Sequence, residues 1–146
     1  MTYQDITNQS KAFLVENEFN KFKIHEWDTL LQSNTLDLGA YEDLLLYFSV
    51  NAFQTKTGFS SVDPPRFLDC LEGEIYNVLS DDKNRGKANI LMSAAISGIS
   101  AMVATKFGLN AFIVSGFSNL IIVSVIKVGI DSWCSFYKKK NPDKQE

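Results

Sequence analysis

The stretch SAAISGISAMVATKFGLNAFIVSGFSNLIIVSVIKVGIDSWCSFYKKK, residues 93–140, decides between two very different folds. It is either a helical hairpin that crosses a membrane or the buried core of a soluble helical domain. Before Lys127 it carries a single charged residue, Lys106. Residues 88–105 and 107–126 therefore form two uncharged, apolar runs of 18 and 20 residues. Each run is long enough, as a helix, to cross a hydrocarbon core about 30 Å thick. The loop residues KFGLN between the runs predict a tight antiparallel hairpin.

The preceding residues, 1–82, show the spacing of amphipathic helices. Apolar side chains recur at three- and four-residue steps, as in Leu38, Tyr41 and Leu45. Asp37 is placed to cap a helix that ends near Gly58, and Asp63-Pro64-Pro65 is a helix start. Residues 21–27 also alternate in period two, so a short strand there is an alternative. The predicted fold class is all-α: a body of about four helices at 1–82, then a hydrophobic two-helix hairpin with a basic tail at 83–140 and a disordered C-terminus at 141–146.

Charge is distributed unevenly along the chain. Residues 1–87 carry a net charge of −6 and residues 88–146 a net charge of +3. Because the body is acidic and the chain has only two arginines, nucleic-acid binding is not expected. The two cysteines, Cys70 and Cys134, form no CxxC pair and suit a reducing compartment, which predicts a cytoplasmic body.

Enzyme chemistry has no recognisable motif in this sequence. Phosphate-binding loops, nucleophile elbows, HExxH and calcium-loop spacings are missing. His25 is the single histidine, so a multi-histidine metal site is excluded. We expect no catalytic residue, cofactor or metal. The acidic side chains of residues 64–79, Asp69, Glu72 and Glu74, are expected to lie on a solvated helix face or on a face that binds a regulatory protein.

Basic and aromatic residues flank the hairpin as they flank membrane helices. Lysines and arginines precede and follow it, whereas its loop carries Lys106 alone, which is the positive-inside pattern for a hairpin with both ends in the cytoplasm. The favoured interpretation is therefore two transmembrane helices at 88–105 and 107–130 in the inner (cytoplasmic) membrane. Aromatic side chains lie just before a lysine cluster, where a membrane-interface belt is expected. The predicted interface residues are Trp133, Phe136, Tyr137, Lys138, Lys139 and Lys140.

Small and polar residues recur within the apolar runs at helical spacing. In lipid, small residues four apart allow close helix contact, and polar residues face a bundle interior or a water path. The residues predicted to line a pore or to pack helices are Ser93, Ser97, Gly98, Ser115, Ser118, Asn119 and Lys127.

The membrane hairpin and the soluble helical domain predict different functions. One hairpin is too small to enclose a path, so the membrane interpretation predicts a homo-oligomeric pore or channel regulated by the acidic body. A toxin or defence effector is a setting by analogy only. The alternative is a soluble, all-helical interaction or regulatory module in the cytoplasm, with the hairpin as its buried core.

Overall fold

The chain folds into a bundle of helices in the computed structural model, which describes residues 3–55, 62–81 and 90–142, and their side chains except for 54, 55 and 90–96. These residues form seven α-helices and one π-helical turn: α1 (Tyr3–Glu16), α2 (Lys21–Gln32), α3 (Leu38–Val50), η1 (Asn51–Thr55), α4 (Pro64–Leu79), α5 (Ile90–Phe107), α6 (Ala111–Val128) and α7 (Ile130–Lys140).

The all-helical prediction is confirmed. The described residues contain no strand, and the alternative of a strand at 21–27 is wrong because these residues lie in α2. The finer prediction, about four helices followed by a two-helix hairpin, is not what the described chain shows, because it has seven helices and α7 follows the hairpin. Gly129, at a φ of 96°, separates α7 from α6 where a run of helix through residue 130 was expected.

Local side-chain chemistry sets several helix ends. Asp37 caps α3 as predicted, since its carboxylate accepts hydrogen bonds from the backbone N–H groups of Gly39 at 2.9 Å and Ala40 at 3.2 Å. Asp63 precedes α4 and Pro64 begins it, but the Asp63 side chain makes no cap hydrogen bond. The predicted end of the central helix near Gly58 lies outside the described residues.

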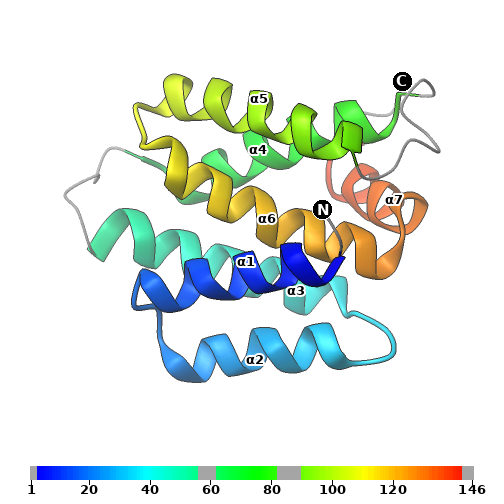
Figure 1. The fold of residues 1–146 in the computed structure, drawn as a ribbon. Helices are drawn as coiled ribbons and strands as arrows, with labels where there is room; N and C mark the ends of the chain where they lie inside the picture. The colour runs from blue at the N-terminus through cyan, green and yellow to red at the C-terminus, as the bar shows by residue number, and fades with distance from the viewer. Residues whose placement is uncertain (1–2, 56–61, 82–89, 143–146) are drawn as a thin grey trace.

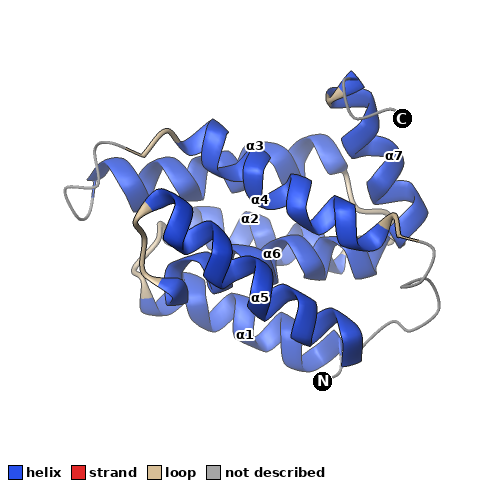
Figure 2. Cartoon of the chain, turned by 90° about the horizontal axis from the view of Figure 1, so that it is seen from above, coloured by secondary structure: helices blue, strands red, loops and turns tan. Residues whose placement is uncertain are grey.

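Helix α6 occupies the middle of the bundle. It runs between α5 on one side and α1 and α3 on the other, and α7 crosses its end (Figure 1). The view from above shows α5 covering α6, with α1 alongside (Figure 2). Leu120, Ile121, Val123 and Val125 have no accessible surface. The whole chain exposes 8100 Å², close to the roughly 7,500 Å² expected of a compact monomer of this mass.

An aromatic cluster joins α6 to the body. The ring of Phe117 lies 5.4 Å from that of Phe13 in α1, 5.6 Å from Phe67 in α4 and 5.8 Å from Phe53 in η1. All four side chains are buried, so the apolar residues of the body and those of the second apolar run share one core.

A glycine allows α1 and α6 to approach closely. A Cβ atom at Gly116 would lie 2.2 Å from Phe13 Cδ1. Gly116→Ala is therefore expected to lower the free energy of unfolding by about 1–3 kcal/mol through overpacking, although alanine favours a helix by about 1 kcal/mol. The matched control is Gly98→Ala, because a Cβ atom at Gly98 meets nothing within 4 Å. Urea unfolding should show a loss for the first variant and none for the second; equal stabilities would contradict the packing described.

Among the residues that the structure describes, one helix, α6, is long and apolar enough to cross a bilayer by length and composition. The outward face of α5 carries small or weakly polar side chains, Ser97, Gly98, Ala101 and Thr105, together with Met102.

Candidate functional site

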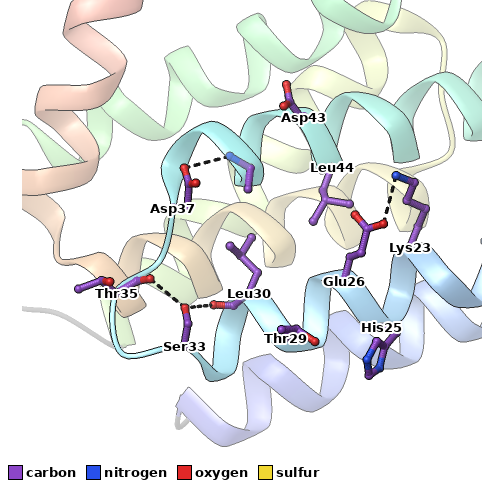
Figure 3. A pocket seen from close by; sticks show the side chains of 11 residues that line it. Lys23, His25, Glu26, Thr29, Leu30, Ser33, Thr35, Asp37, Asp43 and Leu44 are labelled. Atoms are coloured by element: carbon purple, nitrogen blue, oxygen red, sulfur yellow. Dashed lines mark hydrogen bonds and ion pairs between the residues drawn. The ribbon is translucent and has the colours of Figure 1, made fainter.

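A groove with a volume of about 820 Å³ lies between α2 and α3. Leu30 from α2 and Leu44 from α3 point into the space between the helices, and Ala40 completes the apolar lining (Figure 3). Polar side chains surround these residues: Lys23, His25, Glu26, Thr29, Ser33, Thr35, Asp37 and Asp43. The groove lies on the opposite side of α6 from α5 (Figure 1).

Some polar groups of the groove already form hydrogen bonds or ion pairs with neighbouring residues. Asp37 caps α3, and Ser33 Oγ lies 2.8 Å from the carbonyl oxygens of Leu30 and Thr35. Lys23 lies 3.3 Å from Glu26 and also 5.2 Å from the centre of the Tyr47 ring. Asp43 lines the far edge of the groove, where its carboxylate points away from α2 (Figure 3), and it takes part in none of the ion pairs between described residues.

A buried charge cluster lies on the other side of α3. Glu72 of α4 is only 1% exposed. Its carboxylate accepts a hydrogen bond from the Tyr41 hydroxyl at 2.7 Å and another from the Lys140 ammonium at 2.6 Å. Lys140 also donates to Glu42, and Trp133 Nε1–H donates to the Tyr41 oxygen at 3.3 Å. The cluster therefore ties α3, α4 and α7 together.

The environment of this cluster changes the protonation of its members. Burial, reinforced by the neighbouring Glu42 carboxylate, raises the pKa of Glu72 to about 8, although Lys140 opposes the rise. For Lys140, burial disfavours the charged form, but the two carboxylates outweigh it and the pKa is raised. Burial also raises the pKa of Tyr41, which keeps the hydroxyl protonated as a donor. Near neutral pH the Glu72 carboxyl is therefore protonated, while Lys140 stays charged.

The polar groups of this cluster form hydrogen bonds with one another. Each polar atom named is satisfied by another member of the cluster, and Glu72 is closed off from water. No group of three His, Cys, Asp or Glu residues in the described chain could hold a metal ion.

The residues predicted to line a pore or to pack helices are not gathered on one surface. Ser118 is buried and its Oγ lies 2.8 Å from Ser100 Oγ of α5. Ser115 and Asn119 instead line a groove of about 410 Å³ between α1 and α6. The others are dispersed: Ser97 and Gly98 are exposed on α5, Lys127 is half-buried near the end of α6, and the Ser93 side chain lies outside the described part.

The residues predicted for a membrane interface have different surroundings from one another. Trp133 and Tyr137 have no accessible surface, and their rings stack at 5.7 Å. Phe136 is half-buried against Tyr41, whose ring centre is 6.5 Å away. Lys138, Lys139 and Lys140 are all exposed, but the Lys140 ammonium reaches inward to the buried Glu72.

One assignment made from the sequence is wrong. Glu72 was expected on a solvated face with Asp69 and Glu74, but it is buried. The signal was present in its spacing, because Glu72 falls on the helical stripe of Leu68, Ile75 and Leu79, all of which are buried.

Comparison with known proteins returns no relative: no family model matches the sequence, no curated protein matches it, and no solved structure matches the fold. Contacts, burial and charge in the chain itself therefore carry the functional proposal.

Proposed function

We propose that this chain is an all-helical protein-interaction module that works in its folded form and binds a partner on the side of α2 and α3. The observation that carries this proposal is the position of α6. The most apolar of the described helices packs against α1, α3, α5 and α7, and ten of its residues between Val114 and Val125 are buried, so the middle of the helix is covered without lipid.

The α2–α3 groove supports a binding role for that side of the molecule. Its apolar lining and polar rim match the anatomy of protein interfaces, which combine an apolar centre with polar edges. The groove also lies away from α5, so a partner bound there would leave the apolar core undisturbed (Figure 1).

Cell fractionation tests whether the protein acts in the folded, lipid-free form. We expect it in the supernatant after high-speed centrifugation, and any pelleted fraction to be released by alkaline carbonate. Recovery in a carbonate-resistant membrane fraction would contradict the proposal, because an embedded α6 could not at the same time form the core seen here.

Photo-crosslinking tests the binding side. A benzophenone amino acid at Thr29, which lines the groove, should give discrete protein adducts in cells. The matched position is Met102 on α5, which is 48% exposed and distant in the fold. Adducts from Met102 but not from Thr29 would show that the partner binds on the side of α5, which would contradict the proposal.

A membrane effector is the second candidate, favoured by the length and apolarity of α6. In this alternative the α5–α6 hairpin would leave the bundle, insert in the inner membrane with both termini in the cytoplasm, and assemble as a homo-oligomeric pore. The exposed small residues of α5, such as Ser97 and Ala101, would then form helix contacts in lipid.

Asn119→Leu separates the two candidates. In the folded bundle Asn119 is half-buried in the α1–α6 groove, so we expect the change to alter the free energy of unfolding by less than about 0.5 kcal/mol. In a pore, replacing a wetted amide with an apolar side chain would strongly reduce ion flux. Urea unfolding and vesicle flux should both be measured. Flux from the wild type that is lost in the variant would favour the effector.

A further inference from the structure

We propose that the partner of this module presents a basic, amphipathic segment that lies along the outer face of α3, anchored at Leu46 between Asp43 and Asp69. This inference rests on the proposed function and specifies the chemistry of the partner.

The outer face of α3 connects two hollows. The α2–α3 groove lies on one side, and a smaller pocket of about 280 Å³ lies on the other side, between α3, α4 and the end of α7. Asp43 lines both, so the two form one continuous surface. With 13 residues, α3 is about 20 Å long, which matches a helical segment of roughly 14 residues.

Leu46, which lines the smaller pocket, supplies an apolar anchor on this surface. It is 39% exposed, one of few large apolar side chains to be so among the described residues. Pro65 and Leu68 of α4 line the small pocket beside it. Burying such a side chain against a partner leucine removes apolar area from water, which favours association.

The charges around Leu46 are unbalanced. Apart from the buried Glu72, five carboxylates line the two hollows, against two lysines, Lys23 and Lys140. Both lysines already form ion pairs with glutamates: Lys23 with Glu26, and Lys140 with Glu42 and Glu72. Asp43 and Asp69 take part in none of the ion pairs between described residues.

Charge complementarity therefore selects the partner. Lysine or arginine side chains of a bound segment would pair with Asp43 and Asp69, while its apolar side chains cover Leu46 and enter the groove toward Leu44. An anionic ligand, a nucleic acid or an acidic lipid surface would be repelled by the same carboxylates.

Fluorescence anisotropy with the full chain tests the inference. The probe is a fluorescein-labelled 14-residue peptide of leucine and lysine in amphipathic helical spacing, and its counterpart has glutamate in place of lysine. We expect the lysine peptide to bind, with an affinity that falls at high salt, and the glutamate peptide not to bind.

Charge reversal locates the site. Asp43→Lys and Asp69→Lys should each weaken binding of the lysine peptide at least tenfold, and Leu46→Ser should weaken it several-fold without changing the salt dependence. The control is Glu16→Lys on α1, an exposed carboxylate that lines the α1–α6 groove instead, where less than a twofold change is expected. Circular dichroism melting of each variant confirms that it is folded.

Three results would overturn the inference. Equal weakening by Asp43→Lys and Glu16→Lys would mean non-specific attraction. A concentration-dependent dimer in light scattering that Asp43→Lys abolishes would assign this face to a second copy. Failure of the lysine peptide to bind a protein that stays in the carbonate supernatant would reject the basic partner and leave the proposed function standing.

Discussion

Phe117→Ala is expected to lower the free energy of unfolding by about 3–5 kcal/mol, the range for removal of a fully buried aromatic side chain. Its ring has no accessible surface and contacts rings from α1, η1 and α4. Removing the Phe117 ring would break the contacts of α6 with α1, η1 and α4 at the same time. Because the cavity would border three elements, the movement of one side chain could not fill it.

The control for this change lies on the same helix. Phe112 is 84% exposed, so Phe112→Ala should change the free energy of unfolding by less than about 0.5 kcal/mol. Both variants should be unfolded in urea without detergent and followed by circular dichroism. If the two changes cost the same, α6 is not the core helix of the folded protein in water.

The stability of the protein should fall as pH rises from 5 to 8.5 because of Glu72. The pKa of this carboxyl is about 4.5 in a solvated chain and about 8 in the folded protein. Between these values the folded state binds one more proton than the unfolded state, so the free energy of unfolding decreases with pH. The stabilisation is complete below pH 4.5 and is lost as pH rises through 8, and its size is on the order of 5 kcal/mol.

Glu72→Gln isolates this contribution. Glutamine keeps the volume and an acceptor for the Tyr41 hydroxyl but does not titrate. Relative to wild type, the variant should gain stability as pH rises, because the other titrating groups are common to both chains. Urea unfolding at pH 5, 7 and 8.5 measures the difference. A difference that does not vary with pH would show that Glu72 is ionised throughout, held so by Lys140.

Helix positions were predictable because they depend on neighbours in the sequence. The three- and four-residue spacing of apolar side chains marks α1, α3 and α4, and Asp37 caps α3 through its own backbone neighbours. The connection at 108–110 was also visible, since Gly108 adopts a φ of 66° that glycine tolerates best. These are local interactions, and tertiary contacts did not alter them.

The charge cluster was not predictable as a unit, although its members stand in the sequence. Lys140 was grouped with Lys138 and Lys139 as a basic tail, yet it reaches Glu72, 68 residues away, across α3 and α4. Trp133 was expected at a membrane surface and instead donates to Tyr41 inside the bundle. Pairing of this kind depends on how helices pack, which spacing within one helix does not contain.

By itself, the sequence determined that the chain is helical, where α3 and α4 begin, and that 107–126 must be covered by something apolar. Only the tertiary structure decided what covers these residues in the folded chain: side chains of α1, α3, α5 and α7, brought together from both ends of the sequence. Hydropathy measures how much apolar surface must leave water, and the transfer is equally favourable into lipid or into a protein core. The choice depends on whether enough amphipathic helices can pack around the apolar one, and that is a property of the whole fold.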